Sequence, residues 1–390
     1  MHTVQLITYP DSLGGSLAEL NTTLVGPLQD LFRAGVHILP PFPHSGDRGF
    51  APITHAEIDP NHGSWEDIKA IATHHKVTLD LIVNHISRQS KQFQDFLAKG
   101  EDSENATMFI RPEQLWPEGA IPAEDLAKIF LRRASPFSTY TVGDNKEQVQ
   151  VWTTFGHTDP SEQIDIDIDA PITRGYITEI YAHFAIHGVS SVRLDAVGYV
   201  TKKAGTNCFF VEPEVFDALK WLKESAQAHN LSILPEIHAP LRIQKALAER
   251  GYWSYDFASP YLILDALVHH DPSPLVAYLA VRPEKMFTML DCHDGIPVLP
   301  DLEGLVSEER MFKTIKQCSD NGALFSRLLD PPADSKVDVH QINCTYYSAL
   351  GSDEKAYLAA RAIQLFLPGI PQVYYVGLLA GENDRPSVEA

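Results

Sequence analysis

Short apolar runs alternate with helix-like segments along most of the 390-residue chain, and this alternation limits the fold more than any other feature. Runs that are apolar throughout, rather than at every second position, are typical of parallel strands covered on both faces. The expected strands are Val4–Thr8, Val36–Leu39, Thr78–Val83, Ser191–Leu194, Ser232–Leu234, Ser254–Phe257, Phe287–Leu290 and Val373–Tyr375. Eight such strands separated by helices predict an α/β fold of the (β/α)₈ type, a TIM barrel.

Two segments are too long to be ordinary connections between strand and helix. Residues 86–171 follow the third expected strand, and residues 296–346 follow the seventh. In a barrel of this type, long insertions extend from the carboxyl ends of the strands, where the active site lies. The sequence therefore predicts a barrel made of residues 1–85, 172–295 and 347–390, with a first insertion at 86–171 and a second at 296–346.

The charge balance and the cysteines argue against several classes of protein. With 31 lysines and arginines against 51 aspartates and glutamates, the net charge of −20 disfavours nucleic acid or an anionic membrane as a partner. The four cysteines lack CxxC spacing, so neither a disulfide framework nor a zinc site is expected. The N-terminus lacks the pattern of a signal peptide. The longest uncharged run, 362–381, is a poor candidate for a membrane span because it contains prolines and glutamines. A cytoplasmic protein is expected, and its oligomeric state is not indicated.

Charged and polar residues follow four of the expected strands. Within the end of each strand or directly after it stand Asp80, Asn84 and His85 at the third, Arg193 and Asp195 at the fourth, Glu236 and His238 at the fifth, and His293 and Asp294 at the seventh. One carboxylate in such a place could equally cap a helix, but four charged strand ends in order favour an active site. In a barrel, Asp195, Glu236 and Asp294 would converge on one pocket.

Three carboxylates beside an arginine and histidines suit chemistry on glycosides. One carboxylate can attack an anomeric carbon, a second can protonate the leaving oxygen, and a third can stabilise an oxocarbenium-like state. The attacking carboxylate must stay ionised, and we expect Arg193 to keep Asp195 so.

The motifs DLIVNH, RLDAVGY, PEIH and LDCHD resemble the signature regions of the α-amylase family, glycoside hydrolase family 13, and QIDID at 163–167 resembles an additional one. The resemblance covers nearly the whole chain. It implies a retaining mechanism with Asp195 as nucleophile, Glu236 as general acid/base and Asp294 as transition-state stabiliser, with no cofactor and no metal. Carboxyl groups about 5–5.5 Å apart are expected for a retaining pair. The implied sugar-binding residues are Asp47, Phe50, His85, Gln163, Arg193, Tyr199, His238 and His293.

Within that family, longer stretches such as VQLITYPDSLGG and FLPGIPQVYYVGLLAGEND resemble the sucrose phosphorylase group. The resemblance implies that inorganic phosphate, rather than water, takes glucose from the enzyme and releases α-glucose 1-phosphate. Gly198–Tyr199 stands where starch-cleaving members usually carry Lys-His, which fits a short pocket. Arg133 matches the phosphorylase arginine of the first insertion, and its forked guanidinium suits a phosphate.

Two departures from the group's pattern bear on the second half of the substrate. Arg132 replaces a usual proline, and His340, in VDVHQIN, replaces a usual tyrosine. Both changes add potential positive charge, so the resemblance implies sucrose 6′-phosphate as substrate and fructose 6-phosphate as a product. Asp338 and Gln341 are expected near the same subsite by position alone. The alternatives are a phosphorylase of plain sucrose, glucosylglycerate or glucosylglycerol, an α-glucosidase, and an inactive sugar-binding remnant.

The end of the sequence differs from the group's pattern as well. Members of the group continue past LLAGEND into an arginine-bearing loop, a closing helix and a small β-domain, whereas this sequence stops at Ala390. The expectation is a truncated member without these parts. Apolar surface would then be exposed near the eighth strand, and stability would be reduced.

Overall fold

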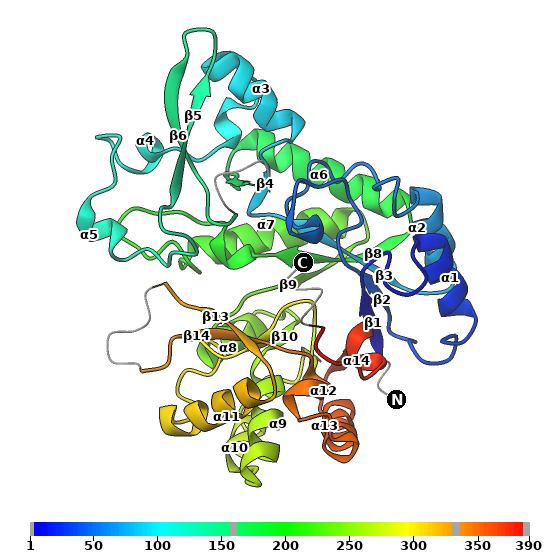
Figure 1. Cartoon of the computed structure of the whole chain (residues 1–390). Coiled ribbons are helices and arrows are strands. Elements are labelled where there is room, and N and C mark those ends of the chain that lie inside the picture. Colours follow the sequence, from blue (N-terminus) through cyan, green and yellow to red (C-terminus); the bar gives the residue numbers. More distant parts are fainter. Residues whose placement is uncertain (1–3, 157–161, 330–335, 385–390) are drawn as a thin grey trace. The chain divides into compact units, whose positions relative to one another are not determined.

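The computed structural model describes residues 4–156, 162–329 and 336–384 (Figure 1). Eight strands in these ranges form one sheet, and each overlaps a run that the sequence predicted. They are β1 (Gln5–Thr8), β2 (Gly35–Ile38), β3 (Val77–Ile82), β8 (Val189–Asp195), β9 (Ser232–Pro235), β10 (Ser254–Asp256), β11 (Met286–Thr288) and β15 (Ile370–Tyr374). Their order is β10-β11-β15-β1-β2-β3-β8-β9, and the pairs with a printed register are parallel. The predicted (β/α)₈ barrel fold is confirmed.

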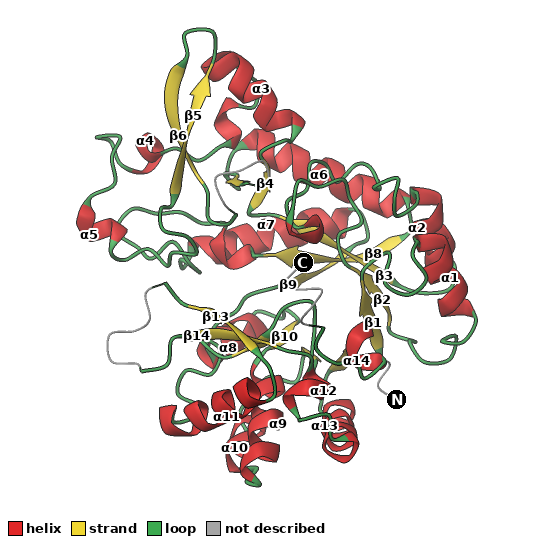
Figure 2. Ribbon diagram, in the orientation of Figure 1, coloured by secondary structure: helices red, strands yellow, loops and turns green. Residues whose placement is uncertain are grey.

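The chain forms two compact units, each named here after one of its residues. Residues 9–27 and 38–237 make up the Arg193 unit, and residues 1–8, 28–37 and 238–390 make up the Asp294 unit. Figure 2 shows helices and strands following one another through both units. The first predicted insertion falls within the Arg193 unit and the second within the Asp294 unit. Their boundaries stay a prediction.

The barrel helices of the Arg193 unit bury one apolar face each. They are α1 (Leu17–Val25), α2 (Trp65–Ala72), α6 (Pro171–Ile186) and α7 (Glu214–Ala228). Helix α2 is capped at its N-terminus, because the backbone N–H of Ser64 donates to Asp67 Oδ2 at 2.8 Å. Ile68 and Ile71 then lie buried on the same side of the helix. Helix α6 packs against β8 and α7, so the strand that carries Arg193 is covered.

The segment between β3 and α6 has a small core of its own. Its elements are β4 (His85–Ser87), α3 (Lys91–Lys99), α4 (Pro112–Leu115), α5 (Ala123–Leu126), β5 (Phe137–Val142), β6 (Glu147–Trp152) and β7 (Gln163–Asp165). Strands β5 and β6 pair antiparallel, as do β4 and β7. Phe93, Phe96, Phe109 and Tyr140 pack together beside them. This core holds β7, with its polar side chains, against the end of β4.

The Asp294 unit packs its helices around α9. The helices are α8 (Leu241–Glu249), α9 (Ala258–His269), α10 (Ser273–Leu279), α11 (Glu308–Asp320), α12 (Tyr346–Ala349), α13 (Glu354–Phe366) and α14 (Tyr375–Leu378). A second sheet, in the order β12-β14-β13, is antiparallel and consists of β12 (Ile296–Pro297), β13 (Leu324–Arg327) and β14 (Val339–Asn343). Helix α9 contacts α10, α11, α13 and β12, so this sheet and the helices share one core.

Several large apolar side chains in the elements before and after β15 are exposed, and their connection with the end of the sequence stays a prediction. Leu358 and Phe366 on α13 are 67% and 87% exposed, and Leu379 after α14 is 66% exposed. Among the described residues, no helix is long and apolar enough to cross a membrane.

Candidate active site

Arg193 lies between three acidic side chains at the end of β8. Its Nη1 atom is 2.5 Å from Asp80 Oδ1 and 2.7 Å from Asp195 Oδ1, and its Nη2 atom is 3.9 Å from Glu236 Oε1. The side chains of these four residues are all at most 13% exposed. The parallel register explains the arrangement, because Asp80 on β3 is directly opposite Arg193 on β8. The sequence showed Asp80 near the end of the third strand, but it did not show the ion pair with Arg193.

Burial, rather than Arg193, dominates the ionisation of Asp195. The pKa of Asp195 is raised to about 8, chiefly by burial; the charge of Arg193 lowers it, whereas the charges of Glu236 and Asp80 raise it. The expectation that Arg193 keeps Asp195 ionised was therefore incomplete, because one guanidinium serves three carboxyl groups. The charge of Glu236 is one cause of the raised pKa of Asp195, so protonation of Asp195 depends on its neighbouring carboxyl group.

Glu236 is fixed by the backbone at the end of β8. Its Oε2 atom accepts a hydrogen bond from the N–H of Ala196 at 2.9 Å, and its own N–H donates to the Leu194 carbonyl at 3.0 Å. Ala196 has a φ of 50°, which is in the left-handed region and costs a residue with a Cβ about 1–2 kcal/mol. This turn directs the Ala196 N–H at the Glu236 carboxylate. The distance between the carboxyl groups of Asp195 and Glu236 stays a prediction.

Four of the residues implied for sugar binding are linked to one another near Arg193. His85 Nε2 is 2.9 Å from the Phe50 carbonyl oxygen, so this nitrogen carries the proton. Burial lowers the pKa of His85, which favours a neutral ring. The Phe50 ring centre is 5.7 Å from Arg193 Cζ. Gln163 Nε2 donates to Asp47 Oδ2 at 3.1 Å, and this bond joins β7 to the short 3₁₀ helix η1 (Asp47–Gly49).

A buried lysine that the sequence analysis did not single out contacts Asn84, the residue before His85. Lys202 Nζ is 2.8 Å from Asp165 Oδ2 and 3.1 Å from Asn84 Oδ1. Asp165 also accepts hydrogen bonds from Asn84 Nδ2 at 3.1 Å and from the Thr154 N–H at 2.8 Å. The side chains of Lys202 and Asp165 are 2% and 0% exposed. Because Asn84 precedes His85, this network fixes the backbone that carries the histidine.

Arg133 is held by an acidic residue of the same segment. Its Nη1 atom is 2.7 Å from Glu162 Oε1, and the Glu162 side chain is completely buried. The hydroxyls of Ser138 and Tyr140 also donate to Glu162. Burial raises the pKa of Tyr140, and its hydrogen bond to Glu162 adds to the effect. Sequence reasoning missed Glu162, because no local pattern connects it with Arg133.

Arg132 and Tyr199 contact the same aromatic side chain. The Arg132 guanidinium lies 5.9 Å from the centre of the Phe155 ring, and Tyr199 meets that ring edge-on at 5.1 Å. Phe130 stacks on Tyr199 at 6.3 Å. The structure thus brings together one residue expected at the glucosyl subsite and one expected at the phosphate subsite.

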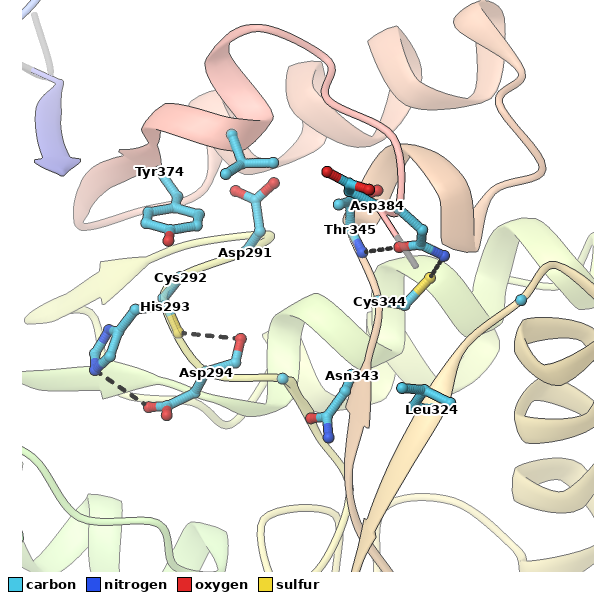
Figure 3. Close-up of a pocket in the computed structure, with 14 residues that line it drawn as sticks. Asp291, Cys292, His293, Asp294, Leu324, Asn343, Cys344, Thr345, Tyr374 and Asp384 are labelled. Carbon is cyan, nitrogen blue, oxygen red and sulfur yellow. Dashed lines mark hydrogen bonds and ion pairs between the residues drawn. The ribbon is translucent and has the colours of Figure 1, made fainter. Parts of the chain in front are cut away.

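His293 and Asp294 lie on the loop after β11, in the Asp294 unit. His293 Nε2 is 3.6 Å from Asp294 Oδ2, and the Asp294 side chain is 36% exposed. Both residues line a cavity of about 360 Å³ (Figure 3). Asp195 and Glu236 belong to the other unit, so their expected convergence with Asp294 stays a prediction.

His238 and His340 approach each other in the Asp294 unit. The His238 ring stacks on Phe257 with 3.9 Å between ring centres, and His238 Nδ1 is 3.2 Å from Asp301 Oδ2. The His340 ring lies edge-on to His238 at 5.9 Å. His340 Nδ1 donates to the Leu299 carbonyl at 2.5 Å, which fixes its ring. Asp301 was missed, since only the folded chain shows that it holds His238.

Asp338 and Gln341 are the last two residues expected at this subsite. Asp338 is paired with Arg327 at the surface, where its side chain is 40% exposed. Gln341 lies half-buried in the middle strand of the antiparallel sheet, opposite Pro297 and Ser326. Their part in binding stays a prediction.

A (β/α)₈ barrel with buried carboxylates around an arginine at the strand ends defines a class of protein, the barrel enzymes that act on glycosidic bonds. The model of the α-amylase catalytic domain matches residues 26–241. The chain belongs to the α-amylase family, as its motifs suggested.

Individual relatives narrow the family to disaccharide phosphorylases. Sucrose 6(F)-phosphate phosphorylase of Thermoanaerobacterium thermosaccharolyticum is 54% identical over 99% of this chain and 79% of its own. Sucrose phosphorylase of Streptococcus mutans is 40% identical over 99% of this chain and 79% of its own. The crystal structure of sucrose 6F-phosphate phosphorylase from Thermoanaerobacter thermosaccharolyticum matches with a TM-score of 0.96 and 53% identity, covering 100% of this chain and 78% of that one.

Proposed function

We propose that this protein is a retaining phosphorylase that cleaves sucrose 6′-phosphate with inorganic phosphate to α-glucose 1-phosphate and fructose 6-phosphate. The carrying observation is the buried cluster in which Arg193 contacts Asp195 and Glu236, in a chain 54% identical to a relative named for this substrate. The extra arginine at position 132 supports the phosphorylated form of the substrate, because it adds positive charge beside the aromatic group of Tyr199.

The reaction would run in two displacements. Asp195 attacks the anomeric carbon of the glucosyl unit, and Glu236 gives its proton to the departing fructosyl oxygen. A glucosyl ester of Asp195 results. Inorganic phosphate then attacks the same carbon, Asp195 leaves as a carboxylate, and Glu236 takes up the phosphate proton. Asp294 would stabilise the oxocarbenium-like states on either side of the ester.

The glucosyl unit would be held by polar groups that are already connected. The pair formed by Gln163 and Asp47 would receive sugar hydroxyls, and the neutral ring of His85 would lie beside the apolar wall of Phe50. The remaining residues proposed for this subsite are Arg193, Tyr199, His238 and His293.

Two cations have separate proposed roles at the acceptor side. Arg133 would bind inorganic phosphate, with Glu162 fixing one edge of its guanidinium and other N–H groups facing the anion. Arg132, together with His340, would bind the phosphate of the fructosyl unit. Asp338 and Gln341 would contact its hydroxyls. The cytoplasmic location expected from the sequence remains a prediction.

The proposal is tested by measuring which product receives the glucosyl unit in the presence and in the absence of inorganic phosphate. The protein is incubated with sucrose 6′-phosphate, and glucose 1-phosphate and free glucose are both measured. We expect glucose 1-phosphate in proportion to the phosphate consumed, whereas free glucose formed at a rate independent of phosphate would identify a hydrolase instead. Asp195→Asn should abolish turnover, and Asp217→Asn, on the exposed face of α7, should not.

A further inference from the structure

We infer that Cys292, His293 and Asp294 form a binding site for a zinc ion, and that zinc bound there inhibits the enzyme. These three consecutive residues follow β11, and one ligand atom from each lies within 4.8 Å of the others. His293 Nε2 is 3.6 Å from Asp294 Oδ2, and Cys292 Sγ is 3.9 Å from the Asp294 carbonyl oxygen. Figure 3 shows the thiol and the carboxylate on the same turn.

The spacing of these atoms suits a tetrahedral zinc site. Bond lengths of about 2.0 Å to nitrogen and oxygen and about 2.3 Å to sulfur place tetrahedral ligands roughly 3.3–3.5 Å apart. The 3.6 Å between His293 and Asp294 is close to this separation. The sulfur of Cys292 lies within 4.8 Å of both other ligand atoms, and zinc binding would require it to move closer to them.

The ligand types favour zinc over the common hard cations. Thiolate and imidazole are preferred by zinc, whereas magnesium and calcium take oxygen ligands almost entirely. On binding, the Cys292 thiol gives its proton to solvent and its sulfur bonds to the metal, while His293 binds through Nε2. The cavity of about 360 Å³ leaves room for water as the fourth ligand.

Zinc should inhibit the enzyme because it would bind two side chains that the reaction needs. This part of the inference rests on the proposed function. Asp294 is proposed to stabilise the transition state, and His293 is proposed to contact the glucosyl unit. A zinc ion bonded to both takes the negative charge of Asp294 away from the reacting carbon. The inhibition should be reversed by a chelator, since no covalent bond within the protein changes.

Titration of zinc chloride against the phosphorylase rate, at low phosphate, tests the effect on activity. Cys344→Ser is the matched control, because Cys344 lines the same cavity and lies outside the group of three ligands. Cys292→Ser should raise the zinc concentration for half-inhibition at least about 10-fold. Mutation of a residue that only hydrogen-bonds to a metal ligand already weakens metal binding about 10-fold, and Cys292 is proposed to be a ligand itself. Cys344→Ser and magnesium chloride should change nothing. Equal zinc sensitivity of the Cys292 and Cys344 variants would overturn the site.

A spectroscopic measurement decides the site without any activity. Cobalt(II) bound to a thiolate gives a charge-transfer band in the near ultraviolet, and this band should appear in the unmodified protein and in Cys344→Ser but not in Cys292→Ser. A missing band in the unmodified protein would refute the metal site. A protein that shows the band but no phosphorolysis would refute the proposed function alone.

Discussion

Replacing Lys202 by methionine would leave Asp165 as a buried carboxylate without its cation. The Lys202 and Asp165 side chains are 2% and 0% exposed, and their charged atoms are 2.8 Å apart. Removing one partner of a buried ion pair costs about 3–5 kcal/mol, because the remaining charge has lost its compensation. Asp165 keeps its hydrogen bonds from Asn84 and Thr154, so we expect the lower end, about 3 kcal/mol.

The matched control is the neighbouring lysine. Lys203 pairs with Glu214, but their side chains are 52% and 33% exposed, and such a pair contributes at most about 1 kcal/mol. Strands of both units form one sheet, and at about 2.1 cal/mol/K of unfolding entropy per residue, 1 kcal/mol shifts the Tm of a chain of 390 residues by about 1 °C. Lys202→Met should therefore lower the Tm by about 4 °C, and Lys203→Met by about 1 °C at most.

Thermal unfolding followed by calorimetry measures both shifts. In the double variant Lys202→Met/Asp165→Asn, the buried carboxylate is replaced by a neutral amide, so part of the lost Tm should return. The reasoning is refuted if Lys202→Met is as stable as Lys203→Met, since the contact would then have no measurable energetic value.

Two further predictions concern pH and the phosphate subsite. Because Asp195 has a pKa raised from 3.8 to about 8, the folded protein binds an extra proton between these values and its stability falls as pH rises through that window. Asp195→Asn should remove this fall, and the Tm advantage of the variant should grow from about pH 5 to about pH 8; a constant difference contradicts the titration. Glu162→Gln should raise the KM for inorganic phosphate about 10-fold through Arg133, with a smaller change in the KM for sucrose 6′-phosphate. An equal change in both KM values would indicate general damage.

The strands and the acidic strand ends were predictable because each depends on a few adjacent residues. The stretch that contains Arg193 and Asp195 begins with mostly uncharged residues and ends with these two charges. That pattern alone indicates a buried strand with an active site at its carboxyl end. The residues with which these charged side chains form ion pairs were not predictable from the sequence. Lys202 and Lys203 are neighbours of the same type, yet only Lys202 is buried, because Asp165 from a distant strand lies beside it.

The electrostatic balance was beyond the sequence for the same reason. The raised pKa of Asp195 depends on burial and on Asp80 and Glu236, which reach Arg193 from two other strands. Glu162 likewise meets Arg133 only after the segment between β3 and α6 has folded around its aromatic core. Sequence motifs thus locate the charged groups, whereas the three-dimensional register decides which of them lie close enough to shift one another's pKa.

The ratio of kcat/KM for sucrose 6′-phosphate to kcat/KM for sucrose, both measured with inorganic phosphate, tests the central claim most directly. A hydrogen bond to a charged group contributes about 1.5–3 kcal/mol, so binding of the fructosyl phosphate by Arg132 alone should make the ratio at least about 10–160. Arg132→Ala should lower the ratio at least about 10-fold, with His340 still contributing, while leaving the rate with plain sucrose nearly unchanged. Equal or better turnover of plain sucrose by the unmodified protein would contradict the account.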